Sequence, residues 1–235
     1  PMYGAHNEYL AGVVSRHPDR FRAFGLVDPR IGDRAHADLE YVAAELGFPG
    51  IKLEPPDTPF FLDDCAYMPF WRRVSDLGLI LAVDLGWNRH DDPYNYQIEQ
   101  LENVIRAFPS MRVVVLHLGI SRLWDRDQTH PFPVLQRTLK LSDYPNVWFE
   151  ISGLQEFCEW EDYPYARAQE ILKVTVDRVG AGRLIWGSDF PGIMLEAGTC
   201  SYPQCVNLIK NHCDFLSSRE KDLILGENAD KLYGF

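Results

Sequence analysis

Three side chains that could carry out acid–base or metal chemistry stand in or at the end of apolar runs. They are Asp84 at the end of LILAVD (79–84), His117 within RVVVLHLG (112–119) and Asp189 at the end of RLIWGSD (183–189). A histidine and two carboxylates could hold a divalent cation and leave a position open for water, which the cation would acidify. Without a metal, His117 could serve as general acid or base while a carboxylate orients it.

Each of the three residues also has a purely structural interpretation. Asp84 and Asp189 could cap the segments that follow them, and His117 could be a hydrogen-bonded histidine of the core. For any one residue the structural interpretation is the commoner one. Three such residues at the ends of strands of one domain favour a functional site, because catalytic groups gather where strand ends meet.

A repeat of short apolar runs and longer helical stretches would position these residues. The runs, rich in Val, Ile, Leu and Phe, predict strands at 21–28, 50–54, 79–84, 112–119, 146–152 and 183–189. Helical periodicity occupies stretches between them, at 34–47, 67–78, 96–108, 133–141 and 165–180. Runs that are apolar throughout are typical of a parallel sheet covered on both faces. The sequence therefore predicts an α/β protein of repeated βα units.

Two architectures are built from such units, an open doubly wound sheet and a closed (β/α)8 TIM barrel. The open sheet normally has a Gly-rich turn after its first strand, and neither G-x-G-x-x-G nor G-x-x-x-x-G-K-[ST] occurs here. Ionisable side chains at the ends of several strands favour the barrel. A barrel needs eight units and only six strands are predicted. We therefore expect one barrel domain over residues 1–235 that lacks its first two βα units. Either an N-terminal part carrying two strands is missing from the sequence, which is the favoured interpretation, or the barrel is incomplete.

Composition and charge limit the possible partners. The 235 residues are 46% apolar and 24% charged, as in an ordinary globular protein, and the net charge is -11. Such a charge repels nucleic acid. The sequence has no apolar stretch of membrane-spanning length and no leader-like start, so we expect no membrane association and a cytoplasmic location. A small-molecule substrate is the expected partner.

The five cysteines are irregularly spaced, which indicates reduced thiols rather than a disulfide framework. Four residues are close enough in sequence to suggest a zinc site: Cys200, Cys205, His212 and Cys213. Their spacing lacks the C-x-x-C pairs of structural zinc sites. Ordinary buried or surface thiols are therefore the favoured interpretation.

Four segments resemble the amidohydrolase-related family (amidohydrolase 2) of the metal-dependent hydrolase superfamily. They are GSDFP (187–191), VVVLHLG (113–119), GIKLE through YMPFW (50–71) and LGENADKLYG (225–234). The resemblance covers essentially the whole chain in the same order. It is to the branch with aminocarboxymuconate-semialdehyde decarboxylase, hydroxybenzoate-type decarboxylases and several lactonases. It implies a (β/α)8 barrel that binds one zinc or manganese ion.

The resemblance also implies roles for individual residues. Asp189 would be a metal ligand and a catalytic acid or base, and His117 would be the catalytic histidine. Asp84 stands where the family keeps a metal-binding histidine, and no H-x-H pair occurs in the sequence. Asp84 could hold a hard divalent ion in place of histidine, or its presence could mean that metal binds weakly or not at all. His90, in the following loop, could substitute as a ligand or simply be exposed.

Other polar residues on predicted strands are candidates for secondary roles. Glu150 and Ser152 face the same way on strand 146–152, and one of them could contact substrate or metal-bound water. Lys52 could be a carbamylated bridging ligand, as in binuclear relatives, although the branch that this sequence resembles does not use one. An ion pair between Lys52 and Glu54 or another neighbour is therefore the expected arrangement.

Three residues in loops after predicted strands complete the expected substrate site. Arg89 and Arg122 could clamp a substrate carboxylate with paired hydrogen bonds, although exposed arginines are often only solvated. Trp87, like other tryptophans on or just after the strands, could wall an aromatic pocket or fill space between barrel and helices.

The predicted function is hydrolysis of a small carboxylated or cyclic substrate, lactone-like or aromatic, through the Asp and His groups at the barrel mouth. The alternative is a non-oxidative, metal-dependent decarboxylase of a hydroxylated aromatic acid, because the same groups could deliver a proton to a ring carbon. A third possibility is a degenerate barrel without catalysis. Apolar helix faces on such barrels commonly meet a second subunit, so we expect a homodimer.

Overall fold

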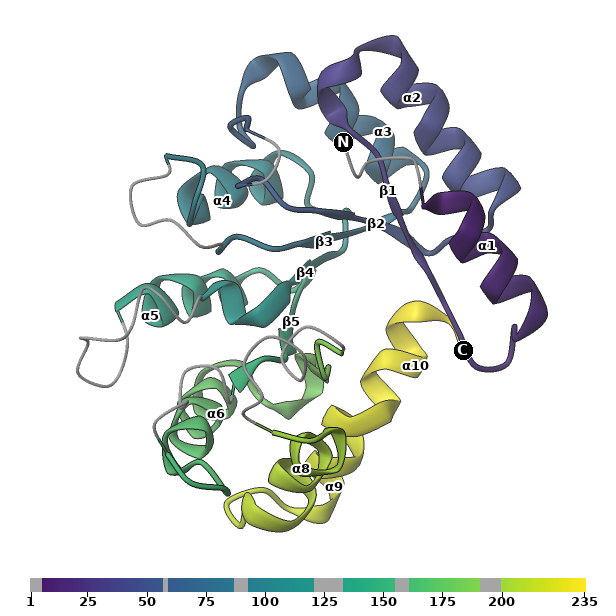
Figure 1. Ribbon diagram of the computed structural model, residues 1–235. Coiled ribbons are helices and arrows are strands. Elements are labelled where there is room, and N and C mark those ends of the chain that lie inside the picture. The colour runs from purple at the N-terminus through teal and green to yellow at the C-terminus, as the bar shows by residue number, and fades with distance from the viewer. Residues whose placement is uncertain (1–5, 57–58, 87–92, 121–132, 155–160, 191–199) are drawn as a thin grey trace. The chain divides into compact units, whose positions relative to one another are not determined.

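The computed structural model describes residues 6–56, 59–86, 93–120, 133–154, 161–190 and 200–235. The chain divides into two compact units. The first comprises Pro1–Val115, Tyr144–Val147 and Tyr233–Phe235, and the second comprises Leu116–Asp143 and Trp148–Leu232. Each unit has its own strands and helices (Figure 1). Each also has its own buried apolar residues.

The first unit is built on four parallel strands. They are β1 (Phe24–Leu26), β2 (Gly50–Leu53), β3 (Ile80–Val83) and β4 (Val113–Val115). Each strand pairs with the next one along the chain, so that Lys52 of β2 lies between Leu26 and Ala82. Parallel neighbours have their carboxyl ends at the same edge of the sheet. Residues that directly follow these strands, such as Asp84, therefore lie at that edge.

Helices precede and connect the strands of the first unit. They are α1 (Asn7–Arg16), α2 (Asp33–Glu40), α3 (Met68–Asp76) and α4 (Ile98–Ala107), with a π-helical turn at Tyr41–Glu45 and 3-10 turns at Pro29–Ile31 and Cys65–Tyr67. In α4, Leu101, Val104 and Ile105 are buried at the spacing of an amphipathic helix. Trp71 of α3 is fully buried, and its indole N–H donates to the Leu62 carbonyl at 2.8 Å. Burial of these apolar faces is the main source of stability.

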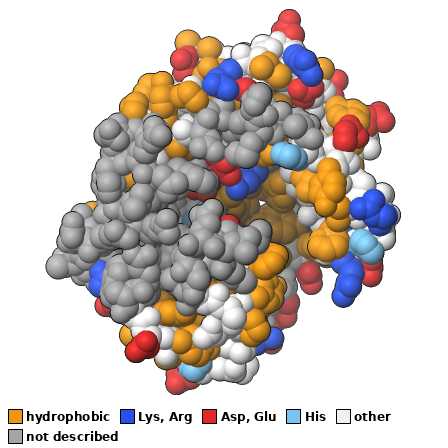
Figure 2. Space-filling model, viewed as in Figure 1, with side chains coloured by type: hydrophobic (Ala, Val, Ile, Leu, Met, Phe, Trp, Pro, Cys, Tyr) orange, Lys and Arg blue, Asp and Glu red, His pale blue; other side chains and the backbone are white. Residues whose placement is uncertain are grey.

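Side chains near both ends of the first unit border β1. The Asn7 amide donates to the Leu26 carbonyl at 3.0 Å and accepts from the Leu26 N–H at 2.9 Å, as a neighbouring strand would. The Arg22 guanidinium lies 4.7 Å from the centre of the Phe235 ring and donates to the Gly234 carbonyl at 2.8 Å. Figure 2 shows hydrophobic side chains beside basic ones over α1, on the right of the view.

The second unit contains two strands, β5 (Val147–Ile151) and β6 (Leu184–Trp186), although Val147 itself belongs to the first unit. The two strands pair in parallel, with Glu150 opposite Ile185. Its helices are α5 (Pro133–Leu139), α6 (Ala166–Val179), α8 (Tyr202–Asn207), α9 (Ser218–Asp222) and α10 (Asn228–Tyr233), with 3-10 turns at Leu116–Gly119, Lys140–Asp143 and Ala181–Arg183 and π-helical turns at Leu208–His212 and Leu223–Glu227. The buried Asn228 side chain donates to the carbonyls of Ala181 and Leu184, both at 2.7 Å. These bonds fix the start of α10 beside β6.

All six predicted strands are present, with helices in the predicted stretches between them, so the α/β class with parallel strands is confirmed. Every strand is shorter than predicted. The differences are largest at 21–28, where β1 covers only Phe24–Leu26, and at 112–119, where β4 ends at Val115. No helix in the described ranges is both long and apolar enough to span a bilayer. A single domain over residues 1–235 stays a prediction.

Candidate active site

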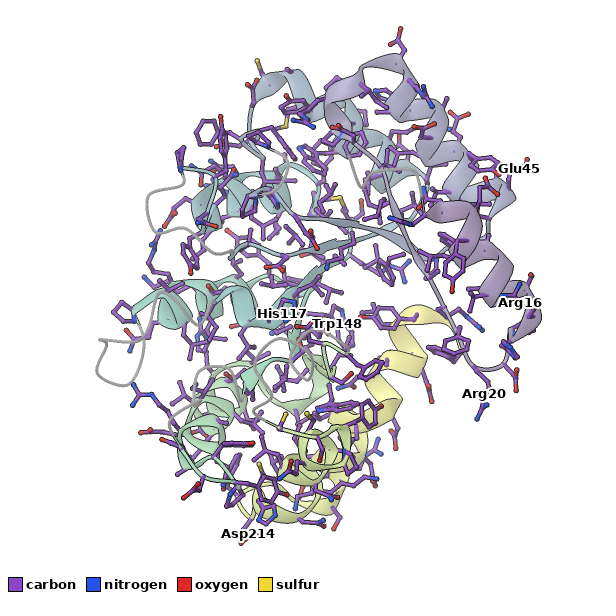
Figure 3. All side chains as sticks on the ribbon, viewed as in Figure 1. Arg16, Arg20, Glu45, His117, Trp148 and Asp214 are labelled. Atoms are coloured by element: carbon purple, nitrogen blue, oxygen red, sulfur yellow. The ribbon has the colours of Figure 1, made fainter. Side chains whose placement is uncertain are left out.

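The second unit brings His117 and Ser152 together. Ser152 Oγ and His117 Nδ1 lie 2.7 Å apart, in a hydrogen bond whose donor depends on the imidazole tautomer. Ser152 directly follows β5 and is 2% exposed, whereas His117 lies in the turn after β4 and is half-buried. Figure 3 labels His117 on this turn. A buried hydroxyl bonded to one ring nitrogen fixes the orientation of the imidazole and influences which nitrogen carries the proton.

The backbone at His117 has a conformation that side-chain-bearing residues rarely adopt. His117 and Leu118 have φ angles of 52° and 56°, and Gly119 follows with 63°. A left-handed non-glycine residue costs about 1 kcal/mol or more and persists only where its surroundings hold it. Here Leu118 is fully buried, and the Ile120 N–H donates to the His117 carbonyl at 3.2 Å. Burial of Leu118 sustains the turn, which ends β4 at Val115 and corrects the strand predicted over 112–119.

Asp189 has the same backbone conformation, with a φ angle of 51°. Strand pairing continues past β6, because the Gly187 N–H donates at 3.0 Å to the carbonyl of the last residue of β5. Ser188 Oγ accepts from the Phe190 N–H at 3.1 Å, and Asp189 is exposed. His117 and Asp189 are two of the five non-glycine residues with positive φ in the described ranges. Such strained residues concentrate at functional sites.

Glu150 and Ser152 lie on the same side of β5, as the two-residue period of a strand predicts. A methyl group built on Gly187 would stand 2.1 Å from Glu150 Oε1 and 3.2 Å from Ser152 Cβ. Only glycine leaves this space, so Gly187 of the GSDFP segment admits the Glu150 carboxylate beside Ser152. The second unit thus collects a histidine, a hydroxyl and a carboxylate at the ends of neighbouring elements.

Asp84 lies at the end of β3 in the first unit and is 4% exposed. Its backbone N–H donates to the Leu53 carbonyl at 2.9 Å, which extends the pairing of β2 and β3 by one residue. Its Oδ1 accepts from the Gly86 N–H at 3.2 Å, the hydrogen bond of a turn that an aspartate caps. The capping role considered for Asp84 is therefore present.

Two further charged pairs lie at the ends of strands of the first unit. Lys52 Nζ and Glu54 Oε1 lie 2.5 Å apart, so the expected ion pair is confirmed. Asp28, after β1, bonds the Arg30 guanidinium through both carboxylate oxygens at 2.9 Å and also accepts from the Arg30 backbone N–H. Burial raises the pKa of Asp28, but the hydrogen bonds and charge of Arg30 outweigh burial and leave the pKa below its ordinary value. Asp28 therefore stays ionised at neutral pH as a paired cap.

The described residues do not by themselves fit a metal ion. Among them, no three His, Cys, Asp or Glu side chains are placed to hold one. The two predicted ligands belong to different units, Asp84 to the first and Asp189 to the second. Within the same ranges, no metal-binding group forms from the cluster considered on sequence spacing, which comprised Cys200, Cys205, His212 and Cys213.

Some predicted site residues lie outside the described ranges, so their roles stay predictions. They are Trp87, Arg89, His90 and Arg122.

The described loops contain a polar residue that the sequence pattern did not single out, Gln97, which is 2% exposed. Its Oε1 accepts from the Leu62 N–H at 2.9 Å, and its Nε2 donates to the carbonyls of Phe60 at 2.9 Å and Tyr94 at 3.0 Å. Gln97 thus joins the segment after β2 to the segment after β3. The one sequence feature that could have identified Gln97 is its position just before an amphipathic helix.

Comparison with known proteins places this geometry in a family context. A family profile described as Amidohydrolase matches residues 1–235. An L-fucono-1,5-lactonase from Burkholderia ambifaria is 28% identical over 96% of this chain and 74% of its own length. A gamma-resorcylate decarboxylase from Polaromonas sp. is 22% identical over 79% of this chain and 64% of its own length. The matched segment thus spans slightly less than two thirds of that decarboxylase.

Solved structures share the fold over nearly the whole chain. A probable 2-pyrone-4,6-dicarboxylic acid hydrolase from Acinetobacter baumannii has a TM-score of 0.76 at 23% identity, covering 99% of this chain and 80% of its own. A dihydroxybenzoic acid decarboxylase from Polaromonas sp., with bound manganese and 2-nitroresorcinol, has a TM-score of 0.67 at 19% identity, covering 97% and 73%. An amidohydrolase from Burkholderia multivorans with bound zinc scores 0.76 at 19% identity, covering 97% and 78%. These likenesses confirm the expected (β/α)8 barrel class.

Proposed function

Because the chain belongs to the amidohydrolase family, we propose that it is a hydrolase that opens a small lactone or a similar cyclic, carboxylated substrate. The observation that carries the proposal is the hydrogen bond between Ser152 Oγ and His117 Nδ1, which orients an imidazole for proton transfer. The similarity to a fuconolactonase and to a probable pyrone dicarboxylic acid hydrolase supports the lactone as substrate class.

Lactone hydrolysis requires that water lose a proton as it attacks the carbonyl carbon, and that the departing alkoxide gain one. When Nδ1 of His117 donates to Ser152 Oγ, Nε2 has the lone pair that a general base needs. His117 then takes the proton from water and returns it to the alkoxide as the ring opens. Asp189 is the proposed second acid or base.

Four further residues are proposed to contact the substrate. The Glu150 carboxylate lies against Gly187 beside Ser152, where it could accept hydrogen bonds from substrate hydroxyl groups. Arg89 and Arg122 are proposed to bind a substrate carboxylate, since paired guanidinium hydrogen bonds suit that group. Trp87 is proposed to cover an apolar or aromatic face of the substrate.

Zinc or manganese is the cofactor that the family implies, because proteins of this fold have been crystallised with each. Asp84 and Asp189 stay the ligands predicted from the resemblance. The described residues supply no complete set of ligands by themselves.

The second candidate function is decarboxylation of a hydroxylated aromatic acid, favoured by the similarity to gamma-resorcylate decarboxylases. The same acid groups would then protonate the ring carbon as the bond to the carboxylate breaks. A barrel without catalysis is not proposed, because the relatives of this chain are hydrolases and decarboxylases. The homodimer and the cytoplasmic location stay predictions.

Product analysis with the full-length protein distinguishes the two reactions. The substrates are L-fucono-1,5-lactone, 2-pyrone-4,6-dicarboxylate and 2,6-dihydroxybenzoate, each incubated with and without added Zn²⁺ or Mn²⁺. We expect proton release and a ring-opened acid from a lactone, with no carbon dioxide. Carbon dioxide from the benzoate without turnover of either lactone would overturn the hydrolase assignment in favour of the decarboxylase.

A further inference from the structure

Two buried cysteines of the second unit contact each other through their sulfur atoms. The Sγ atoms of Cys200 and Cys205 lie 3.1 Å apart, within reach of an S–H···S hydrogen bond. Cys200 is 8% exposed and Cys205 is 4% exposed. Neither is among the residues placed around His117, and in the described ranges they form no group of three metal-binding side chains.

The start of α8 explains why the two thiols meet. Ser201 is the N-cap residue of this helix, and its N–H donates to Gln204 Oε1 at 2.8 Å in a capping box. Cys200 therefore directly precedes the cap, and Cys205 lies four residues after it. Apolar side chains at these two positions normally pack together as a hydrophobic staple. Here both positions are cysteine, so the helix start itself holds one thiol against the other.

We propose that Cys200 and Cys205 form a reversible dithiol–disulfide site that reacts with hydrogen peroxide. Their sulfur atoms need to approach by only about 1 Å to reach the length of a disulfide bond. First, the Cys200 sulfur attacks one peroxide oxygen, the O–O bond breaks, and the thiol proton leaves with the other oxygen as water. Next, the Cys205 sulfur attacks the resulting sulfenic acid, so that the S–S bond forms, the S–O bond breaks and a second water leaves. The peroxide is reduced and two thiols are oxidised.

The order of these steps follows from the different surroundings of the two thiols. The hydrogen bond with Cys200, followed by burial, raises the pKa of Cys205, so Cys205 keeps its proton at neutral pH. Cys200 is the more exposed of the two and is therefore the thiol that peroxide meets first. Cys213 is fully buried, and no contact between its sulfur and a second sulfur is found in the described ranges.

The disulfide would convert an apolar contact at the start of α8 into a covalent one. Closing a loop between these residues restricts the unfolded chain, so oxidation should raise the thermal midpoint of unfolding by a few degrees. Cys200 is eleven positions after Asp189 in the sequence, so the link would lie in the segment that follows a proposed catalytic residue. The inference itself is independent of which reaction the enzyme catalyses.

The test is peptide mapping of the native full-length protein after graded treatment with hydrogen peroxide. Remaining thiols are blocked with N-ethylmaleimide before trypsin digestion. Cleavage after Arg183 and Lys210 leaves both cysteines on one peptide, residues 184–210, whereas Cys213 falls on residues 211–219 and Cys65 on residues 53–72. We expect peptide 184–210 to lose two hydrogen atoms, to escape alkylation, and to regain both thiols after treatment with dithiothreitol.

Two variants sharpen this result. Cys205→Ser removes the resolving thiol, so Cys200 should accumulate as a sulfenic acid that dimedone traps. Cys213→Ser removes a buried thiol of the same unit and should leave the cross-link unchanged. Full alkylation of both cysteines in the wild type, at peroxide concentrations that oxidise the exposed Cys65, would overturn the proposal. A disulfide from Cys200 to any residue other than Cys205 would overturn it as well, and both outcomes are readable in the wild-type protein alone.

Discussion

Ser152 Oγ lies 2.7 Å from His117 Nδ1, although the two residues are 35 positions apart in the sequence. The contact joins a buried hydroxyl at the end of one strand to an imidazole held in a left-handed turn after another. The orientation of the ring is therefore set by the protein before any substrate arrives. That is the positioning that a general base requires, because proton transfer depends on geometry first.

Replacing Ser152 by alanine removes this hydrogen bond and leaves the backbone unchanged. We expect kcat for lactone opening to fall about tenfold, with little change in KM, because the base is misoriented while substrate contacts remain. Ser152→Thr keeps the hydroxyl and is expected to retain more of the activity. Steady-state kinetics on both variants checks this. Equal activity of Ser152→Ala and the wild type would mean that the bond does not position the base.

Gly187→Ala tests the packing of the Glu150 carboxylate. The new methyl group would lie 2.1 Å from Glu150 Oε1, so we expect a loss of about 1–3 kcal/mol in the free energy of unfolding. Urea unfolding measures it. Gly182→Ala is the matched control, since no atom lies within 4 Å of a methyl group built there. Combining Gly187→Ala with Glu150→Ala should recover part of the loss. Equal stability of the two single variants would contradict the packing described.

The strands and the class of fold could be predicted because their signals are local. Apolar runs located all six strands, and the two-residue period placed Glu150 and Ser152 on one side of β5. The turn at His117 could not be predicted, because Leu116 and Leu118 continue the apolar pattern of the strand while the backbone turns left-handed. The hydrophobic pattern of a sequence indicates which residues are buried, but it does not indicate the sign of φ.

Contacts between distant segments were equally invisible in the sequence. The sequence does not distinguish Gly187 from other glycines, because the Glu150 carboxylate packs against it only in the folded structure. Gln97 reads as a polar residue before a helix until its three hydrogen bonds to two loops are seen. Such residues depend on tertiary packing, which leaves no periodic signal in a single sequence.

Gln97→Ala is expected to destabilise the first unit. It would leave the Leu62 N–H and the Phe60 carbonyl without their buried partner, which should cost about 2–4 kcal/mol. Gln97→Met keeps a similar volume and so isolates the contribution of the hydrogen bonds. Gln136→Ala, at an exposed position of α5, should stay within about 0.5 kcal/mol of the wild type. The same cost for Gln97→Ala and Gln136→Ala in urea unfolding would refute the role given to Gln97.

Ionisation of Cys213 should lower the free energy of unfolding at alkaline pH. Burial is the main cause that raises the pKa of this thiol from its ordinary value of 9.0 to about 11. Since the folded state holds the proton more tightly, the stabilisation is complete below pH 9 and disappears as pH rises through about 11.

We expect a loss of about 2 kcal/mol between about pH 8 and pH 11, measured by urea unfolding in the presence of a reductant. Cys213→Val should lose less over the same interval, because it has no thiol to ionise. Cys65→Ala, which removes an exposed thiol, should behave as the wild type. If Cys213→Val and the wild type lose the same amount, burial of Cys213 is not a source of the pH dependence.

Asp84→His tests whether this position binds metal. Imidazole is the ligand that the sequence resemblance implies here, so the substitution is expected to raise the affinity for Zn²⁺, whereas Asp84→Asn should lower it. Metal titration of the full-length protein, with circular dichroism to verify folding, gives both values. Identical affinities in the wild type and both variants would show that Asp84 acts only as the cap of its turn.

The most direct test of the central claim is the effect of His117→Gln on lactone opening. Glutamine retains hydrogen bonding but cannot exchange a proton near neutral pH, so kcat/KM should fall about 100-fold or more while the protein stays folded. His17→Gln, at an exposed position that follows α1, serves as the control and should leave kcat/KM unchanged. A His117→Gln enzyme that opens the lactone as fast as the wild type would contradict the account.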